Sequence, residues 1–318
     1  MDSKKNKYNT FYCMWPNAAR TVRDMLYSTF DMARHHLLRS TNRVAQTAAP
    51  ACYATDWQPT TRNMQLSLII PAYNEATRLG ATLATVFAYL RQELPASEVI
   101  IVDDGSQDNT AGVADEFVAR HAGPIRAEVI RVAPNRGKGH ALRVGLLAAC
   151  APVALFSDAD LSTPISELPK LVDPIIRGEC DVAFGSRALD RSLIGVRQPW
   201  RREQGGKVMN LVIRMATGLP FWDTQCGFKA FRMEVCRPLI AATRIDRFGF
   251  DVEYLYVMQR AGLRLQEIPV RWDHYEGSKL SVVRDTLRMF DEIRRIRQYA
   301  ARGVYSSQKS AGSQKSKV

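Results

Sequence analysis

The stretch Val153-Ala-Leu-Phe-Ser-Asp-Ala-Asp160 decides how this chain is read. Its first four residues are apolar, and two aspartates two positions apart, Asp158 and Asp160, close it. An earlier apolar run, Val99–Val102, ends in the acidic pair Asp103-Asp104. Short apolar runs of this kind are typical of buried strands. Because residues i and i+2 of a strand point to one side, we expect Asp158 and Asp160 to turn both carboxylates toward one hard cation, Mg²⁺ or Mn²⁺.

Outward from this stretch, short β-branched runs alternate with helical patterns, and the alternation predicts the fold. The expected strands are Leu66–Ile70, Val99–Val102, Val129–Val132, Val153–Phe156, Val182–Phe184, 226–232 and 264–271. The expected helices lie near 76–92, 108–121, 138–150, 166–177, 202–217 and 251–261. The order predicts an α/β domain with a mostly parallel sheet and helices on both faces. Ligands in such sheets bind at the carboxyl ends of the strands, where Pro71, Asp103 and Asp158 fall.

The charge of the chain is unevenly distributed. The whole chain has a net charge of +12, of which residues 1–65 contribute +5 and residues 284–318 contribute +6. Basic ends beside a nearly neutral centre indicate an acidic surface as partner, either anionic lipid or nucleic acid. No stretch of the sequence has the roughly 18 consecutive apolar residues of a membrane-spanning helix. Residues 2–10 are polar and no apolar core of a secretory signal follows them. The six cysteines lack zinc-site spacing, so we expect a cytoplasmic protein with reduced thiols.

Eight short motifs carry a resemblance to a known family. In chain order they are Pro71–Glu75, Val102–Ser106 with Asp108, Asn135–Gly139, Asp158–Asp160, Phe184–Arg187, Asp223–Lys229, Phe250–Glu253 and Gly277–Leu280. The first four resemble family 2 inverting glycosyltransferases, and the later ones resemble more narrowly the dolichyl-phosphate β-glucosyltransferase branch. The resemblance covers about residues 65–297. It implies a GT-A type, Rossmann-like fold that transfers a hexose, glucose from UDP-glucose, to dolichyl or polyprenyl phosphate with inversion.

The residues expected to hold the nucleotide sugar lie at strand ends or at the start of a helix. They are Pro71, Ala72, Tyr73, Glu75, Asp103, Asp104, Lys138 and Asp158. Pro71 would end the first strand, so that Tyr73 and Glu75 offer an aromatic face and an acceptor to uracil. Asp103 and Asp104 could accept hydrogen bonds from base and ribose, although a turn at Asp104-Gly105 with one carboxylate as a helix cap is the alternative. Lys138, between two glycines, could meet phosphate charge.

Asp158 and Asp160 are the predicted metal ligands. Mg²⁺ or Mn²⁺ held by both would offset the charge that develops on the departing diphosphate. The alternative is a capped helix start at Ser162-Thr163-Pro164, where proline suits the first helical turn.

The acceptor side is predicted from Arg187, Arg202 and Asp251. Guanidinium forks bind phosphate in bidentate geometry, as comparable arginines do in the related polyprenyl-phosphate mannosyltransferases. A solvated basic face is the alternative for Arg201-Arg202. Asp251 falls where the wider family places its general base. A hydroxyl acceptor would need that base, whereas an ionised lipid phosphate needs little such help, so Asp251 either abstracts a proton or positions the substrates. A helix cap is the alternative for this residue.

The ends of the chain predict peripheral attachment at the cytoplasmic face of a membrane. We divide the chain into a basic, partly amphipathic extension (1–64), the catalytic domain (65–280), a basic amphipathic helix (281–302) and a disordered tail (303–318). Basic amphipathic helices can lie in an anionic membrane interface. The alternative is a helix packed on the core with a solvated basic face, which we favour for the first half of the C-terminal helix.

Three other functions stay open. The first is transfer to a small or glycan hydroxyl acceptor, with Asp251 as the base. The second is nucleotidyl transfer, which is disfavoured because no glycine-rich loop with a basic residue follows the first strand. The third is nucleic-acid binding by the basic ends. It is disfavoured because carboxylates at the strand ends repel phosphate unless a metal intervenes, so we expect no nucleic-acid partner.

Overall fold

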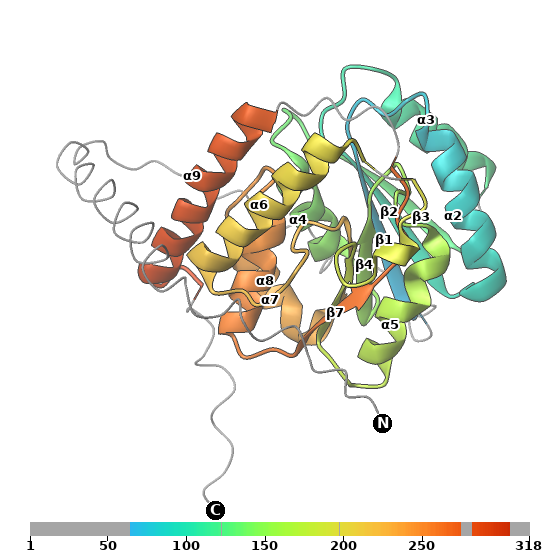
Figure 1. The fold of residues 1–318 in the computed structure, drawn as a ribbon. Coiled ribbons are helices and arrows are strands. Elements are labelled where there is room, and N and C mark those ends of the chain that lie inside the picture. Colours follow the sequence, from blue (N-terminus) through green and yellow to red (C-terminus); the bar gives the residue numbers. More distant parts are fainter. Residues whose placement is uncertain (1–63, 122, 197, 275–281, 306–318) are drawn as a thin grey trace, which may run out of the picture. The chain divides into compact units, whose positions relative to one another are not determined.

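The computed structural model describes residues 64–305 except 122, 197 and 275–281, and its centre is a seven-stranded sheet (Figure 1). The strands are β1 (Leu66–Ala72), β2 (Ser97–Asp103), β3 (Arg126–Arg131), β4 (Val153–Ser157), β5 (Val182–Ser186), β6 (Phe228–Arg232) and β7 (Leu265–Pro269). Their order is β3-β2-β1-β4-β6-β5-β7. β6 runs antiparallel to β4 and β5, and every other pair is parallel. The predicted mostly parallel sheet is confirmed.

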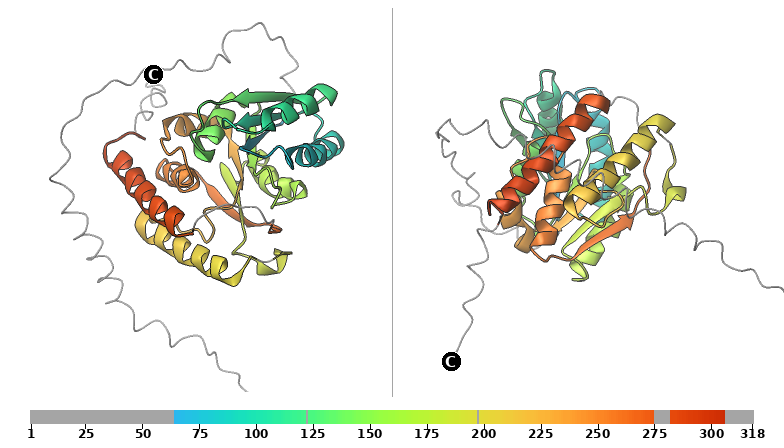
Figure 2. Two further views of the ribbon diagram at one scale, coloured as in Figure 1. Left: turned by 90° about the horizontal axis from the view of Figure 1, so that it is seen from above. Right: turned by 60° about the vertical axis from the view of Figure 1, so that its left-hand side comes forward.

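Helices cover both faces of this sheet, as the alternation predicts (Figure 2). They are α2 (Leu79–Glu93), α3 (Thr110–Arg120), α4 (Lys138–Ala148), α5 (Leu168–Ile176), α6 (Trp200–Thr217), α7 (Met233–Ala242), α8 (Phe250–Arg260) and α9 (Val282–Ala301), with short 3-10 turns at Ile165–Glu167 and Arg191–Leu193. Leu68 and Ile70 belong to the core shared with α2, α3 and α5. Ile69 belongs to the core shared with α4, α7 and α8, which follows from the two-residue period of a strand.

The central strands are buried over their full length. Every residue of β1, β2, β4 and β5 is buried, which explains why these strands read as continuous apolar runs rather than as alternating patterns. β3 lies at one edge and exposes Arg126, Glu128 and Arg131. The buried thiols of Cys180, Cys226 and Cys236 act as small core side chains.

Two details of the fold differ from the sequence prediction. β1 does not end at Pro71 but continues to Ala72, which pairs with Asp103 of β2. Pairing of β1 with β4 stops at Ile69, so Pro71, which has no N–H to donate, lies where only β2 flanks the strand. The second difference is α7, which follows β6 directly and which the sequence reading did not separate from its surroundings.

The predicted C-terminal amphipathic helix is present as α9, beside α6 and α8 (Figures 1 and 2). It packs on the core through the buried side chains of Met289 in its first half, as expected, and of Ile293 and Ile296 in its second half. The side chains of 282–287 lie outside the described residues, as do the N-terminal extension up to residue 63 and the tail from 306. The predictions for those segments stay predictions. Among the described helices, none is both long enough and apolar enough to cross a bilayer.

Candidate active site

The loops that follow β1 and β2 are joined at one edge of the sheet. The amide of Asp104 donates to the carbonyl of Ala72 at 2.9 Å, which ties the ends of the two strands together. Asn74, in the left-handed region with φ 56°, donates its amide to the Ser106 hydroxyl at 2.9 Å. Between these contacts Tyr73 is 42% exposed, so an aromatic face is available at the strand end, as the sequence predicts.

The two aspartates after β2 have different surroundings. Asp103 accepts hydrogen bonds from the amide and hydroxyl of Ser106. The buried carboxylate of Asp104 accepts from the side-chain amide of Asn135 at 2.9 Å and from the amide of Gly137 at 2.7 Å. Burial raises the pKa of Asp104, against the lowering effect of its backbone hydrogen bonds. Asp104 therefore holds the loop that leads into α4, and contact with base or ribose stays a prediction.

The glycines around Lys138 are needed for packing. A Cβ at Gly139 would lie 2.6 Å from Cβ of Phe250. At Gly137, with φ +120°, it would lie 2.6 Å from the carbonyl oxygen of Asp246. The two glycines therefore allow the start of α4 to pack closely against the segment 245–250 that leads into α8. This packing fixes the first turn of α4 and with it Lys138.

Lys138 points its ammonium group at the acidic stretch after β4. Its Nζ lies 2.5 Å from Oδ1 of Asp158. Burial lowers the pKa of Lys138, but the negative charges of Asp158, Asp251 and Asp160 outweigh that effect and raise it. Asp158 and Asp160 also both raise the pKa of Arg78, after the larger effect of its hydrogen bond to Glu75. The carboxylates of Asp158 and Asp160 thus act on the same two cations.

The prediction that Asp158 and Asp160 share a face of a continuing strand is wrong in its geometry. β4 ends at Ser157, and the next residues turn, with the amide of Leu161 donating to the carbonyl of Asp158 at 3.1 Å. Leu161 takes a left-handed φ of 49°. Oδ1 of Asp160 accepts the amide of Ser162 at 2.9 Å. The turn therefore replaces the strand alternation; Asp158 pairs with Lys138, and the charge of Asp160 also acts on that lysine.

The surroundings of Asp158 fit a divalent cation bound together with a ligand. A Cβ at Gly227 would lie 2.2 Å from Oδ2 of Asp158, so only glycine leaves room for this carboxylate. Carboxylate oxygens are the ligands that Mg²⁺ and Mn²⁺ prefer. Within the described part of the chain, no three His, Cys, Asp or Glu side chains group as metal ligands. The remaining ligands of an ion on Asp158 and Asp160 would therefore be oxygens of the substrate or of water.

Asp251 lies in the first turn of α8 and is buried against a lysine that the sequence analysis did not single out. Nζ of Lys229, which is fully buried, lies 2.5 Å from Oδ1 of Asp251 and 2.5 Å from the carbonyl of Cys226. Burial raises the pKa of Asp251, whereas the charges of Lys229 and Lys138 oppose the rise. Asp251 is thus an ion-paired group beside the Lys138–Asp158 pair. Its role as base or positioning group stays a prediction.

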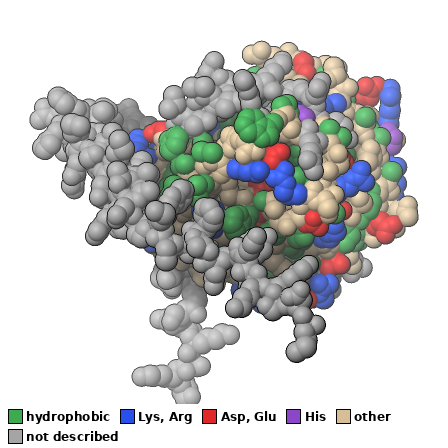
Figure 3. Space-filling model, viewed as in Figure 1, with side chains coloured by type: hydrophobic (Ala, Val, Ile, Leu, Met, Phe, Trp, Pro, Cys, Tyr) green, Lys and Arg blue, Asp and Glu red, His purple; other side chains and the backbone are tan. Residues whose placement is uncertain are grey.

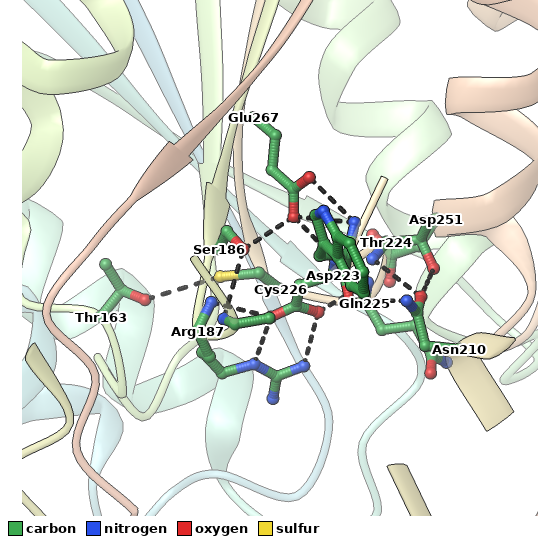
Figure 4. Close-up of polar contacts among 12 residues, drawn as sticks. Thr163, Ser186, Arg187, Asn210, Asp223, Thr224, Gln225, Cys226, Asp251 and Glu267 are labelled. Atoms are coloured by element: carbon green, nitrogen blue, oxygen red, sulfur yellow. Dashed lines mark hydrogen bonds and ion pairs between the residues drawn. The ribbon is translucent and has the colours of Figure 1, made fainter. Parts of the chain in front are cut away.

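Arg187, at the end of β5, is held by Asp223 through two parallel hydrogen bonds (Figure 4). Nε and Nη2 donate to the two carboxylate oxygens at 2.6 and 2.8 Å. Asp223 is buried, which raises its pKa, but Arg187 reverses this effect and lowers it. Glu267 in turn accepts the amide of Asp223 at 2.7 Å and the hydroxyl of Ser186 at 2.7 Å. The carboxylate of Asp223 therefore holds the guanidinium group in position, and the carboxylate of Glu267 holds the backbone of Asp223.

A cavity of about 150 Å³ opens beside Arg187. Its lining includes Trp222 and Trp272, and Asn210 of α6, whose side-chain amide donates to the carbonyl of Trp222 at 2.6 Å. Since a guanidinium group has five N–H donors and Asp223 takes two of them, Arg187 can still offer donors to a ligand in this cavity. Arg202 lies in the first turn of α6, but its side chain lies outside the described residues.

Several residues that build the site escaped the sequence analysis as individuals. They are Asn210, Asp223, Gly227, Lys229 and Glu267. A usable signal existed for Lys229, because a lysine between Phe228 and Ala230 interrupts a run that is otherwise apolar up to Phe231. The position of Glu267 in β7 carries no comparable signal, since its role depends on the β5–β7 pairing.

Comparisons with known proteins agree with this architecture. Residues 67–239 match the model of the family described as Glycosyl transferase family 2. The Dolichyl-phosphate beta-glucosyltransferase of Drosophila melanogaster is 37% identical over 239 residues, which are 71% of this chain and 72% of that protein. The protein of the same name from Homo sapiens is 34% identical over 253 residues, 76% of each chain.

Solved structures share the fold at low sequence identity. Glucosyl-3-phosphoglycerate synthase from Mycobacterium tuberculosis, in complex with Mn²⁺, uridine diphosphate and glucosyl-3-phosphoglycerate, superposes with a TM-score of 0.54 at 18% identity. The superposition covers 74% of this chain and 80% of that one. The GT-A type fold expected from the motifs is confirmed, and the chain belongs to glycosyl transferase family 2.

Proposed function

We propose that the protein transfers glucose from UDP-glucose to the phosphate of dolichol or a related polyprenol, with inversion at the anomeric carbon. One observation carries the proposal: the short segment Asp223–Lys229 connects two half-sites. At one end Asp223 holds Arg187 in the cavity, and further along Gly227 lies against Asp158. The segment Asp223–Lys229 thus positions both the site for the leaving diphosphate, at Asp158, and the basic cavity for the acceptor, at Arg187.

On the donor side, Tyr73, Glu75 and Asp103 would hold the uridine at the ends of β1 and β2. Asp158 and Asp160 would hold Mg²⁺ or Mn²⁺, which when bound neutralises negative charge on the departing diphosphate. Lys138 already meets Asp158 and would add a second positive charge at the same place. The Mn²⁺ and uridine diphosphate named for the mycobacterial synthase support this assignment.

On the acceptor side, Arg187 would orient a lipid phosphate, with Arg202 as the expected second contact. A phosphate oxygen attacks the anomeric carbon from the face opposite UDP, and the bond from that carbon to the diphosphate breaks with its electron pair leaving on UDP. The phosphate is already ionised near neutral pH, so no proton must be removed. Asp251 is paired with Lys229, so it is not a free general base. It therefore suits transfer to a phosphate better than transfer to a hydroxyl group, which would need such a base.

The names of the relatives support a dolichyl-phosphate acceptor, and the acceptor implies work at a membrane surface. We therefore infer peripheral attachment at the cytoplasmic face of a membrane.

The test is a transfer assay with radiolabelled donors. Purified protein is incubated with UDP-glucose or GDP-mannose, with dolichyl phosphate or soluble hydroxyl acceptors, in the presence of Mg²⁺, Mn²⁺ or EDTA. We expect label from UDP-glucose in the lipid product, dependent on the added metal. Transfer only to a soluble hydroxyl acceptor, or equal transfer in EDTA, would overturn the proposal.

A further inference from the structure

Helix α6 exposes a stripe of large apolar side chains. Trp200, Val208 and Met215 are 72%, 63% and 57% exposed, and Leu211 is 48% exposed. With 3.6 residues per turn, these four positions fall within an arc of roughly 80° on one side of the helix. The opposite side of α6 packs inward through Ile213, which is fully buried. A contiguous apolar stripe on the outer side of a helix marks a binding surface rather than a solvated face.

The stripe borders the cavity that would take the acceptor. Three residues of the same helix line that cavity: Lys207 lies roughly 20° from the edge of the stripe, whereas Gly206 and Asn210 lie on the inward side of the helix. Trp222 also lines it and is 58% exposed, with the guanidinium carbon of Arg214 4.2 Å from its ring centre. On α6, Lys207 and Arg214 therefore lie between the stripe and the cavity, and the exposed ring of Trp222 lies at the cavity rim.

Basic residues outnumber acidic ones on α6, which carries this stripe, and on its neighbour α9. α6 and α9 lie side by side in Figures 1 and 2, and together their sequences hold nine Arg and Lys against four Asp and Glu. α9 adds the exposed Phe290 and the exposed Arg297. Figure 3 shows hydrophobic side chains beside Lys and Arg side chains on the face that carries these helices.

We propose that the α6 stripe, formed by Trp200, Val208, Leu211 and Met215, docks the enzyme onto an anionic lipid bilayer, with the Arg187 cavity opening toward the headgroups. The inference deepens the proposed lipid-phosphate function and rests on it for the orientation of the cavity. Apolar side chains inserted among headgroups, with basic residues beside them, match the chemistry of an anionic bilayer surface. Tryptophan suits that interface because its ring is amphipathic. A second copy of this chain fits less well, since it would bring two basic faces together.

The first experiment is co-sedimentation of the full chain with vesicles of phosphatidylcholine, with and without phosphatidylserine. The variant Leu211→Glu/Met215→Glu places two carboxylates in the stripe without touching the residues that line the cavity. We expect its partitioning onto phosphatidylserine vesicles to fall by about tenfold or more. A carboxylate cannot insert into the bilayer as the apolar side chain does, so the free energy gained by burying that side chain in the bilayer is lost. The matched control is Ile176→Glu, an equally exposed apolar side chain at the end of α5, which should partition like the unmodified chain.

The second experiment needs no disruptive variant. Vesicles that contain brominated lipids should quench the fluorescence of Trp200, so the quenching should be smaller in the conservative variant Trp200→Phe. Unchanged partitioning of the Leu211→Glu/Met215→Glu variant, or equal quenching with and without Trp200, would overturn the inference. So would a dimer in solution that the double variant dissociates, since the stripe would then bind a second copy. UDP binding by the double variant should stay unchanged, so a failure of docking can be distinguished from a failure of the proposed transfer reaction.

Discussion

At the scale of single residues, the acidic turn after β4 decides whether a metal-bound diphosphate can be held. The structure places Asp158 between Lys138 and the backbone of Gly227, while Asp160 closes the turn through Ser162. The two aspartates thus have different surroundings. The carboxylate of Asp158 contacts Lys138 and the backbone of Gly227, whereas that of Asp160 accepts a hydrogen bond from the amide of Ser162.

We predict that Asp160→Asn abolishes glucose transfer and the metal-dependent part of UDP binding. Losing one of two protein carboxylates leaves the metal poorly held and the diphosphate charge poorly neutralised. Isothermal titration of UDP with and without Mn²⁺ measures the binding. The control is Asp173→Asn, a half-exposed aspartate on α5 away from the site. Transfer that persists in both EDTA and the Asp160 variant would contradict a metal role.

Gly227→Ala should reduce Mn²⁺-dependent UDP binding while the chain still folds. The added Cβ would lie 2.2 Å from Oδ2 of Asp158, far inside van der Waals contact, so the carboxylate must move. Gly205→Ala, on α6, is the matched control, because a Cβ there meets nothing within 4 Å. In a helix that control should even stabilise the fold, by about 0.5–1 kcal/mol. UDP binding by Gly227→Ala at the level of this control would show that the glycine is not required.

At the scale of elements, strands could be predicted and turns could not. β1, β2, β4 and β5 are continuous apolar runs because both faces of the sheet are covered, and such runs are visible in a sequence. The turn after Ser157 depends on Leu161, whose backbone is in the left-handed region. A leucine side chain does not indicate this conformation, so the turn could not be predicted. α7 follows β6 without a linker, and no turn signal separates the two.

Removing one partner of the buried ion pair between β6 and α8 should strongly destabilise the fold. Lys229→Met leaves the carboxylate of Asp251 buried without its counter-charge, which should lower the free energy of unfolding by about 3–5 kcal/mol. Urea titration measures the change. Lys170→Met is the control: its ammonium group pairs with Glu167 at 2.6 Å on the surface, where such pairs contribute about 0–1 kcal/mol. An equal decrease in the free energy of unfolding in the two variants would contradict the burial of the Lys229–Asp251 pair.

Asp181, just before β5, should make stability depend on pH. Its buried carboxylate accepts the amide of Arg264 at 2.9 Å and pairs with Arg232 at 2.5 Å. Burial raises the pKa of Asp181, but Arg264 and Arg232 outweigh it and lower the pKa. A lowered folded pKa gives stability that is present above the unfolded pKa and lost as the pH falls through the folded pKa.

The variant Asp181→Asn therefore tests this linkage. At pH 7 it should be less stable than the unmodified chain by about 1–3 kcal/mol, since a charged hydrogen-bond acceptor is lost. The difference should shrink as the pH falls below about 4, where the unfolded carboxylate takes up its proton. Urea titrations at several pH values measure both. A difference that stays constant down to acid pH would contradict the assigned pKa shift.

At the scale of the whole molecule, the sequence predicted which strand ends carry polar residues but not how they are supported. The motifs identified Asp158, Arg187 and Asp251, since their residue types and order are visible in the chain. Their partners Lys229 and Asp223 become partners only when β6 inserts antiparallel between β4 and β5. Such long-range pairing is fixed by the packing of the complete sheet, so a local pattern cannot specify it.

The last prediction concerns the basic extension that precedes the sheet. A protein that begins at Asn63 should bind UDP as tightly as the full chain, because the seven strands and the described contacts of the site lie within residues 64–305. Residues 1–62 hold nine Lys and Arg against four Asp and Glu. The shortened protein should therefore bind phosphatidylserine vesicles more weakly than the full chain at 0.1 M salt, where the Debye length is about 10 Å.

At 1 M salt the Debye length is about 3 Å, so the electrostatic contribution of the extension should vanish and the two proteins should bind vesicles nearly equally. What remains at high salt should then depend on the apolar stripe of α6, whose contribution is not screened. Co-sedimentation of both proteins across the salt range measures these two contributions separately. Loss of UDP binding in the shortened protein, or a vesicle-binding difference that persists at 1 M salt, would show that the extension does more than supply charge.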